Sequence, residues 1–491
     1  MQKMYIDGKW VPSVSGATRD IINPATGETI ATVAEGGRED ARLAIAAARR
    51  AFDESDWPRR PHRDRARLLM KLADLIEANA AELARIETAN NGKPYVDAED
   101  DAYTAANVFR YYAGLIGKPD GQTYDLPPPY EGKVVREPIG VCGLIVPWNF
   151  PLMMASWKLA PCLAAGNTAV FKPSEITPLS AIRLFELMEE AGFPPGVANL
   201  LLGSGAEAGA ELAESMHVDK IAFTGGTETG RTIMRAAAGN IKKISLELGG
   251  KSANIVFADA DLDVATDYGV YGIFLNAGQV CASGSRLLVQ ESIYEKFMEK
   301  LAAKARSIRV GNGMDPETEM GPLVSKAHME KVLNYIEIGQ KEGAKLVTGG
   351  RRLTEGELAK GFFVEPTIFT NVTRDMRIYR EEIFGPVLVV QTFKDEEEAV
   401  RLANDSIFGL AGAVFTSDYE NAMRVSGKVR VGVFWVNAYH PAFVEAPWGG
   451  YKQSGIGREL GTFGLEAYME VKQVVYNREP RPLGYYHWNR S

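Results

Sequence analysis

The sequence predicts an α/β protein built from doubly wound parallel sheets. With 491 residues, the chain is long enough for two or three domains. From about residue 139, short apolar runs alternate with helical segments, and a second series of the same kind starts at Ser252 and continues to about residue 450. Strands separated by helices of this length pair in parallel through right-handed crossovers.

The first 90 residues predict a hairpin and two helices. The start, M-Q-K-M-Y-I-D-G-K-W, alternates apolar and polar residues and contains an Asp-Gly turn, which favours a hairpin over a signal peptide. Long amphipathic helices are expected near 39–52 and 62–90. Gly92 is a plausible end of the second helix.

The first βα series has regular spacing. Its expected strands and helices alternate as strand 139–146, helix 152–165, strand 168–172, helix 179–191, strand 198–202, a helix near 206–214 and strand 220–224. The second series begins with the strand A-N-I-V-F at 253–257. Residues 138–157 carry no charge, but the three prolines among them break a helix, so we interpret this stretch as the core of a soluble protein.

Two segments fit neither series. Residues 120–137 are rich in proline and have the character of an exposed strand, and residues 469–476 form a late strand. A terminal strand without a nearby partner in the sequence commonly pairs across a subunit interface. We therefore expect an oligomer.

Composition excludes several classes of function. Lys+Arg 55 against Asp+Glu 63 gives a net charge of −8, which argues against a nucleic-acid binder or a protein of anionic membrane surfaces. Three scattered cysteines provide no disulfide framework, and they and the five histidines show no metal-ligand spacing. We expect a reduced, cytoplasmic compartment and no metal.

Cys281 lies in N-A-G-Q-V-C-A-S-G-S-R at 276–286. Free cysteine is usually a small buried residue of the core. Gly278 and Gly284, together with the small residues between them, instead allow backbone and ligand to approach the thiol closely. From these residues alone, both interpretations stay open.

Three segments are candidates for binding a nucleotide. G-S-G-A-E-A-G at 203–209 is one residue too long for the usual dinucleotide fingerprint and is weak alone. F-T-G-G-T-E-T-G at 223–230 opens a helix that could receive a pyrophosphate, or is an ordinary turn. In F-K-P-S-E at 171–175, Lys172 ends a strand and Glu175 could accept hydrogen bonds from a ribose, although both could be surface charges.

Two further residues suggest chemistry. Glu247, in L-E-L-G-G-K, is a carboxylate inside an apolar strand, where it is either half of a buried salt bridge or a base with a raised pKa. Asn149, in P-W-N-F-P, offers an amide donor on a rigid turn. It could stabilise an oxyanion or simply cap the turn.

Together these segments resemble the NAD(P)-dependent aldehyde dehydrogenase superfamily over essentially the whole chain. The motifs occur in that family's order: P-W-N-F-P, F-K-P-S-E, F-T-G-G-T-E-T-G, E-L-G-G-K, G-Q-V-C, E-E-I-F-G-P and P-W-G-G-Y-K-Q-S-G-I-G-R-E-L-G. The chain is most similar to bacterial betaine-aldehyde dehydrogenases. The resemblance implies an aldehyde-dehydrogenase-like fold with a Rossmann-like cofactor domain and a catalytic domain, plus a small β oligomerisation element.

The resemblance also implies catalytic roles. Cys281 matches the nucleophile, Glu247 the general base, and Asn149 with the backbone N–H of Cys281 the oxyanion hole. Lys158 and Glu459 match positions linked to a proton path. The expected reaction oxidises an aldehyde to its carboxylic acid through a thiohemiacetal and a thioester on the cysteine.

The expected cofactor is NAD, with NADP less favoured because Glu175 should repel a 2′-phosphate. Glu382 matches the contact to the nicotinamide ribose. The full set of expected cofactor-binding residues is Val146, Pro147, Trp148, Lys172, Ser174, Glu175, Gly205, Gly209, Thr224, Gly225, Gly226, Leu248, Glu382 and Phe384.

Phe150, Trp157, Val280 and Trp448 are expected to contact the substrate. Aromatic rings suit a quaternary ammonium such as that of betaine aldehyde, and Glu445 could add a favourable charge. Ala442, however, stands where a tyrosine is expected in betaine-type enzymes, so an ω-aminoaldehyde or a bulkier aliphatic or aromatic aldehyde remains an alternative. A thiol hydrolase without nucleotide and a non-catalytic binding or structural relative are remote alternatives.

The resemblance further divides the chain. Residues 1–117 and 138–249 are expected to form the NAD-binding domain, 250–452 the catalytic domain, and 118–137 with 453–491 the oligomerisation element. The expected partners are a small aldehyde and further copies of the chain in a homodimer or homotetramer, with no nucleic acid and no membrane.

Overall fold

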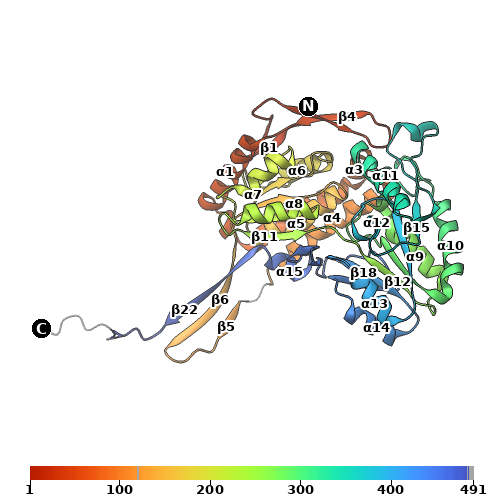
Figure 1. Ribbon diagram of the computed structural model, residues 1–491. Helices are drawn as coiled ribbons and strands as arrows, with labels where there is room; N and C mark the ends of the chain where they lie inside the picture. The colour runs from red at the N-terminus through yellow and green to blue at the C-terminus, as the bar shows by residue number, and fades with distance from the viewer. Residues whose placement is uncertain (119–120, 484, 486–491) are drawn as a thin grey trace.

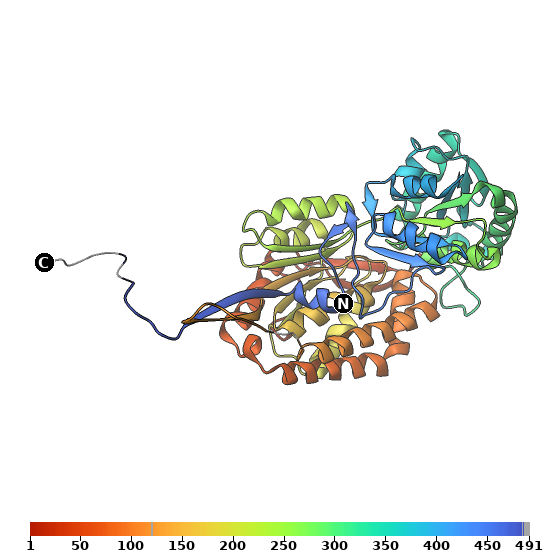
Figure 2. The ribbon, with the colours of Figure 1, turned by 90° about the horizontal axis from the view of Figure 1, so that it is seen from below.

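The computed structural model describes residues 1–118, 121–483 and 485. It contains two α/β bodies side by side, each around its own sheet, and an arm of three strands that projects from the first body (Figure 1, Figure 2). The predicted fold class is confirmed. Residues 119–120, 484 and 486–491 of the predicted oligomerisation element lie outside the described residues.

The first sheet has eight strands in the order β2-β1-β9-β8-β7-β10-β11-β21. Its five central strands are parallel, and the strand order reverses between β7 and β10. Ligands of open α/β sheets bind outside the carboxyl ends of the strands at such a reversal. The bounds are β1 Met4–Ile6, β2 Lys9–Val11, β7 Val141–Ile145, β8 Thr168–Lys172, β9 Ala198–Leu200, β10 Lys220–Thr224, β11 Lys243–Glu247 and β21 Gly455–Ile456.

Helices surround this sheet, and most were predicted. They are α1 Arg38–Glu54, α2 His62–Ala78, α3 Ala80–Asn91, α4 Tyr95–Leu115, α5 Pro151–Ala165, α6 Leu179–Ala191, the π-helical turn η2 Gly205–Gly209, α7 Ala210–Glu214 and α8 Thr227–Ala237. The single helix predicted at 62–90 was wrong in one respect. It is interrupted at Asn79, whose backbone leaves helical geometry, and it does end at Gly92, in the left-handed conformation. Helix α4 was missed.

The second sheet has seven strands in the order β14-β15-β16-β13-β12-β18-β19, all parallel except β14. Its strands are β12 Ala253–Val256, β13 Arg286–Gln290, β14 Lys345–Thr348, β15 Thr367–Thr370, β16 Val387–Phe393, β18 Ala411–Phe415 and β19 Val433–Val436. Its helices are α9 Leu262–Phe274, α10 Tyr294–Ser307, α11 Lys326–Lys341, α12 Arg377–Arg380, α13 Glu396–Asn404 and α14 Tyr419–Lys428. The second βα series is therefore present as predicted.

The late strand, β22 Met469–Asn477, pairs antiparallel with β6 Tyr130–Pro138 of the same chain along its full length. Strand β5 Gln122–Tyr124 adds to the other edge of β6, which completes the projecting arm (Figure 1). The late strand has no partner nearby in the sequence, as expected, and it pairs instead with the distant segment 130–138 of the same chain. Strand β21, placed by sequence with the oligomerisation element, instead extends the first sheet beside β11.

Four short strands complete the fold. β3 Thr18–Ile22 and β4 Thr29–Ala34 form a hairpin, β17 Phe408–Gly409 pairs with β20 Tyr451–Lys452, and the short helix α15 Gly461–Glu466 precedes β22. Within the described part of the chain, no helix has the length and apolar character needed to cross a membrane.

Candidate active site

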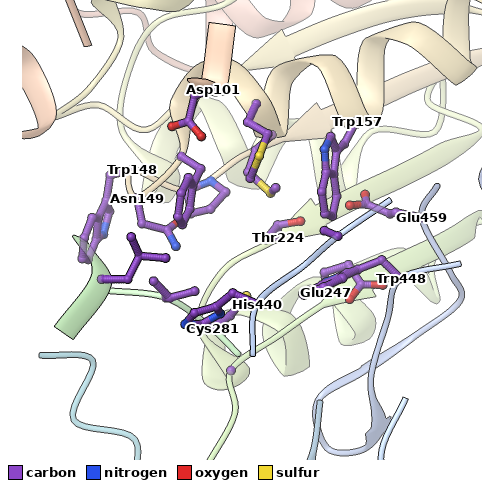
Figure 3. Close-up of a pocket in the computed structure, with 18 of the residues that line it drawn as sticks. Asp101, Trp148, Asn149, Trp157, Thr224, Glu247, Cys281, His440, Trp448 and Glu459 are labelled. Atoms are coloured by element: carbon purple, nitrogen blue, oxygen red, sulfur yellow. The ribbon is translucent and has the colours of Figure 1, made fainter. Parts of the chain in front are cut away.

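A cavity of about 880 Å³ opens at the carboxyl edge of the first sheet, where the second body meets it. The loop after β7, the loop after β10 and the end of β11 line it from one body, and Cys281 lines it from the other. Figure 3 shows Trp148 and Asn149 at one side of this cavity, with Glu247, Glu459, Trp157 and Trp448 at the other. The reversal of strand order therefore places these loops around one space.

Cys281 precedes β13 and faces this cavity, and unlike Cys142 and Cys162 it is not buried in the core. The preceding turn contains Asn276 and Ala277 in left-handed backbone conformations, which are uncommon for residues other than glycine. Burial raises the pKa of the Cys281 thiol to about 12, and the charges of Glu382 and Glu247 add to this effect. The thiol is therefore protonated at neutral pH, and attack on a carbonyl requires that it lose this proton.

Glu247, the last residue of β11, is 4% exposed, and neither of its carboxylate oxygens has a hydrogen-bond partner among the described residues. Burial, reinforced by the charge of Glu459, holds the pKa of Glu247 well above its ordinary value. The unpaired carboxyl group excludes the buried salt bridge, which was one of the two interpretations of Glu247 that the sequence allowed. An unpaired carboxyl group with a raised pKa suits general-base chemistry.

Lys158 and Glu459 form a buried ion pair beside Glu247. Lys158, on α5, donates a hydrogen bond to Oε1 of Glu459, which lies 301 residues away in the sequence. Within the described part of the chain, Oε2 of Glu459 has no hydrogen-bond partner, and Glu459 lines the cavity, as Lys158 does not. Glu247, Glu459 and Lys158 thus form a row of buried ionisable groups that leads away from the cavity.

Asn149 links the loop after β7 to the segment that carries Cys281. Its Nδ2 donates a hydrogen bond of 2.9 Å to the backbone carbonyl of Gln279, and Nδ2 of Asn276 donates one of 3.0 Å to the carbonyl of Asn149. One of the two N–H bonds of the Asn149 amide is therefore used to fix the loop. The other remains available for a ligand.

A cluster of paired charges, which the sequence analysis missed, lies behind Phe150. Lys93 is fully buried; its Nζ donates to Asp101, lies 3.7 Å from Glu87 and sits 4.0 Å from the centre of the Phe150 ring. Glu87 in turn accepts a hydrogen bond from the backbone N–H of Leu152 at the start of α5. This Lys93 cluster holds the loop that carries Asn149 from behind.

Most of the predicted cofactor residues lie along the carboxyl edge of the first sheet, whereas Glu382 and Phe384 come from the second body, between α12 and β16. Nζ of Lys172 donates hydrogen bonds of 2.9 Å to the carbonyls of Pro173 and Gly203, and lies 3.8 Å from Glu175. Among the residues that the structure describes, no side chain approaches the position that a Cβ would take on Gly205 or Gly226, so a ligand has access to the backbone there. Of the predicted set, Pro147, Trp148, Thr224, Gly225, Gly226, Leu248, Glu382 and Phe384 line the cavity, whereas Val146, Lys172, Ser174, Glu175, Gly205 and Gly209 do not.

The predicted substrate residues all line the cavity. The rings of Trp157 and Trp448 meet edge to face with centroids 5.7 Å apart, and Phe150 and Val280 contribute further apolar wall. Ala442 also lines the cavity. Glu445, which could add a favourable charge, is exposed and lies outside the lining, next to Val444, which is part of it.

Sequence reasoning missed several polar residues of the lining. Asp97, Asp100 and Asp101 lie on the first turns of α4. Asp101 is paired with Lys93, whereas Asp97 and Asp100 add negative charge, and burial raises the pKa of Asp97 to about 6. The acidic run D-A-E-D-D at 97–101 was the sequence feature that could have indicated these cavity carboxylates. His440 also lines the cavity, but its Nε2 donates a 3.1 Å hydrogen bond to the carbonyl of Gly272, and burial lowers its pKa to about 4. Among the described residues, His, Cys, Asp and Glu form no group of three or more that could hold a metal ion.

Comparison with known proteins agrees with this geometry. Residues 10–474 match the model of the aldehyde dehydrogenase family. The chain belongs to the aldehyde dehydrogenase family. This membership confirms the predicted enzyme class, and the predicted resemblance to betaine-type enzymes is confirmed by the relatives described next.

Betaine aldehyde dehydrogenase of Bacillus subtilis is 56% identical to this chain over 99% of both proteins, and human retinal dehydrogenase 2 is 49% identical over 96% of this chain and 91% of its own length. Among solved structures, betaine aldehyde dehydrogenase of Staphylococcus aureus in complex with NAD+ superimposes with a TM-score of 0.98, at 50% identity, over 99% of this chain and 97% of that chain.

Proposed function

We propose that this enzyme oxidises betaine aldehyde to glycine betaine, with NAD+ as the hydride acceptor and Cys281 as the nucleophile. The observation that carries the proposal is the convergence on one cavity of a cysteine, an unpaired buried carboxyl group and an amide donor: Cys281, Glu247 and Asn149. These are the groups that a covalent oxidation of an aldehyde requires.

The reaction follows from their chemistry. The thiol of Cys281 gives its proton to water in the cavity, and the sulfur attacks the aldehyde carbon while the amide of Asn149 and the backbone N–H of Cys281 stabilise the oxyanion of the thiohemiacetal. Loss of hydride from that carbon leaves a thioester on the sulfur. Glu247 then takes a proton from water, whose oxygen attacks the thioester and releases the carboxylate and the cysteine. Lys158 and Glu459 are suited to carry the proton away from Glu247.

The residues at the carboxyl edge of the first sheet fit NAD+. When bound, this group accepts the hydride. The backbone at Gly205 and Gly226, which no side chain of the described residues covers, suits the pyrophosphate. Glu382 and Phe384, which line the cavity together with Cys281, suit the nicotinamide end. Glu175 should repel a 2′-phosphate, so we favour NAD+ over NADP+. The related S. aureus enzyme was solved with NAD+.

The cavity favours a cationic aldehyde. Trp157 and Trp448 provide aromatic surface, which attracts a quaternary ammonium by about 0.5–2 kcal/mol per contact. Asp97 and Asp100 add negative charge at the same cavity. The relatives in B. subtilis and S. aureus are named for betaine aldehyde. Phe150 contributes less to the binding of a cationic aldehyde than its position in the lining suggests, because the ammonium of Lys93 already faces its ring.

A second candidate substrate is an ω-aminoaldehyde or a bulkier aldehyde. Ala442 leaves room in the lining of the cavity where the betaine-type pattern has a tyrosine. A thiol hydrolase has less support, because the imidazole of His440 is engaged with Gly272.

We also propose a homodimer or homotetramer in the cytoplasm. The arm of β5, β6 and β22 carries exposed apolar side chains, among them Tyr124, Tyr130, Val471 and Val475, which suit burial against another copy. The proposed division remains an NAD-binding domain of 1–117 and 138–249, a catalytic domain of 250–452, and an oligomerisation element of 118–137 and 453–491.

NADH formation tests the function, with betaine aldehyde, 4-aminobutanal, hexanal and benzaldehyde as substrates of the wild type and of Cys281→Ala. We expect the highest kcat/KM for betaine aldehyde and no turnover by the variant. A higher kcat/KM for 4-aminobutanal or hexanal would support the second candidate. Absence of NADH with every aldehyde, or undiminished turnover by Cys281→Ala, would refute the mechanism.

A further inference from the structure

Asn91, the last residue of α3, is fully buried behind the loop that carries Asn149. Its Nδ2 donates a hydrogen bond of 2.8 Å to the backbone carbonyl of Trp148 and one of 3.4 Å to that of Asn149. Two successive carbonyls of the loop after β7 therefore accept hydrogen bonds from a single amide group. Asn91 is not part of the cavity lining, so it reaches the cavity only through this loop.

The orientation of the Asn91 amide is fixed from its other end. Its Oδ1 accepts a hydrogen bond of 3.2 Å from the backbone N–H of Lys93, two residues later, which is the usual geometry of an asparagine that closes its own turn. Gly92, between them, has a left-handed backbone (φ 97°), and a Cβ there would lie 2.7 Å from the ring of Pro322. Because Oδ1 faces Lys93, Nδ2 is directed at the loop.

The turn formed by Asn91, Gly92 and Lys93 packs backbone to backbone against the second body. A Cβ on Gly321 would lie 2.0 Å from the carbonyl oxygen of Gly92, and a Cβ on Gly313 would lie 2.2 Å from that of Lys93. The backbone N–H of Tyr95 donates a hydrogen bond of 2.8 Å to the carbonyl of Gly313. Such close contacts leave the turn little freedom to move relative to the second body.

The same part of the second body holds Gln279, two residues before Cys281. The side-chain Oε1 of Gln279 accepts a hydrogen bond of 2.9 Å from the backbone N–H of Val324, and its carbonyl accepts the 2.9 Å hydrogen bond from Nδ2 of Asn149. A closed path of contacts thus runs from Asn91 through Asn149 to Gln279 and back through the second body. This path sets the position of Asn149 relative to the segment with Cys281.

We propose that Asn91 is a positioning residue for the oxyanion site. By holding the carbonyls of Trp148 and Asn149, it directs the remaining N–H of the Asn149 amide at the oxygen that becomes negatively charged when the sulfur attacks. This inference rests on the proposed function, which assigns the oxyanion to Asn149. Displacement of a catalytic group by about 1 Å can cost about 10²-fold in rate, so a residue outside the cavity can have a large effect.

Acylation of Cys281 by p-nitrophenyl acetate tests the proposal without cofactor or aldehyde. The thiol gives its proton to water, the sulfur bonds to the acetyl carbon through an oxyanion, and p-nitrophenolate leaves as the thioester forms. Asn91→Ala should slow the burst of p-nitrophenolate about tenfold to 10²-fold. Asn91→Asp keeps an acceptor for the N–H of Lys93 but has no donor for the loop, and it should slow the burst to a similar extent.

A double-mutant cycle separates positioning from a general structural role. In an enzyme that already carries Asn149→Ala, the further change Asn91→Ala should alter the burst rate less than about twofold, because the side chain that Asn91 positions is gone. Equal slowing by Asn91→Ala in the wild type and in Asn149→Ala would overturn the proposal. A burst rate of Asn91→Ala and Asn91→Asp within about twofold of the wild type would also overturn it.

Asn90→Ala is the matched control. Asn90 is the neighbouring residue, is also buried, and bonds to the carbonyl of Ile176 and the N–H of Leu179 instead of the loop with Asn149. It should lower Tm but leave the burst rate at the wild-type value. Alkylation of Cys281 by iodoacetamide, which displaces iodide and forms no oxyanion, should proceed at the wild-type rate in Asn91→Ala. Equal slowing of alkylation and acylation would indicate a distorted cavity and would contradict the proposal.

NADH formation, measured separately, distinguishes failure of this inference from failure of the proposed function. Absence of NADH with every aldehyde, together with a normal burst of p-nitrophenolate, would count against the proposed function, and the burst rates would still decide the role of Asn91. A wild-type enzyme without a burst would overturn the inference, because there would be no oxyanion site for Asn91 to position.

Discussion

Two groups of buried charge border the cavity, and they differ in how their members are paired. Around Lys93, one ammonium meets the carboxylates of Asp101 and Glu87, and its remaining face lies on Phe150. Glu247 is equally buried, but in the part of the chain that the structure describes, its oxygens have no partner. The charges of the Lys93 cluster are used in pairing with one another, whereas the absence of pairing leaves Glu247 able to accept a proton.

The comparison explains why one cavity contains both arrangements. A buried charge without a partner is costly, so a protein keeps one only where the surroundings hold it in place. The Lys93 cluster fixes the start of α5 and the loop with Asn149. Reactivity is therefore concentrated at Glu247 and Cys281, and the neighbouring paired charges hold the geometry.

The largest effect is expected from removing the unpaired base. Glu247→Gln should lower kcat by about 10²–10⁴, because water then attacks the thioester without a base. One turnover of NADH should still form rapidly, so the variant should show a burst followed by a slow steady state. Absence of a burst would show that Glu247 is needed in a step before the thioester forms.

The same residue predicts a pH dependence. Because burial raises the pKa of Glu247, its carboxyl group is protonated, and inactive as a base, over a wider range of pH than an exposed glutamate. The steady-state kcat of the wild type should therefore rise with pH until Glu247 ionises. The burst of NADH, measured in the same samples, separates this effect from ionisation of Cys281.

The next largest effect is expected from removing the amide of Asn149, which lies between the Lys93 cluster and Glu247. Asn149→Ala should lower kcat by about 10²–10³, the usual consequence of losing one oxyanion donor. Asn149→Asp has nearly the same shape but no N–H donor, and it should lose as much activity. If Asn149→Asp kept most of the activity, the side chain would act through packing and not as a donor.

Breaking the paired cluster should mainly affect stability. Lys93→Met leaves the carboxylates of Asp101 and Glu87 buried without their cation, which should lower the free energy of unfolding by about 3 kcal/mol. Urea unfolding measures this, with Lys71→Met as the control, since Lys71 is exposed and, within the described part of the chain, donates only to the carbonyl of Glu190. A change below about 1 kcal/mol would show that the pairing is unimportant for stability.

The smallest expected effect concerns substrate charge. Asp97→Asn together with Asp100→Asn should raise KM for betaine aldehyde about threefold to tenfold, because exposed or half-buried charges act weakly across a cavity. KM for the uncharged hexanal should not change. Glu99→Gln is the matched control, since Glu99 is on the same helix but outside the cavity lining. Equal changes in KM for both aldehydes would contradict a role in charge selection.

The sequence alone determined the features that depend on local pattern. Alternating strands and helices predicted both parallel sheets, and Gly92 was recognised as a helix end because a left-handed position favours glycine. The order of the motifs identified the family and selected Cys281, Glu247 and Asn149. Each of these signals is contained in a few neighbouring residues, which is why no structure was needed to find them.

Tertiary structure alone decided how the buried charges are paired. The sequence left open whether Glu247 was half of a salt bridge, because its surroundings include Glu459, more than 200 residues away in the chain. The contacts of Lys93 with Phe150 and of Lys158 with Glu459, and the pairing of β22 with β6, also join distant segments. Burial and pairing depend on which segments the packed fold brings together. A short stretch of sequence does not show which distant segments it will contact.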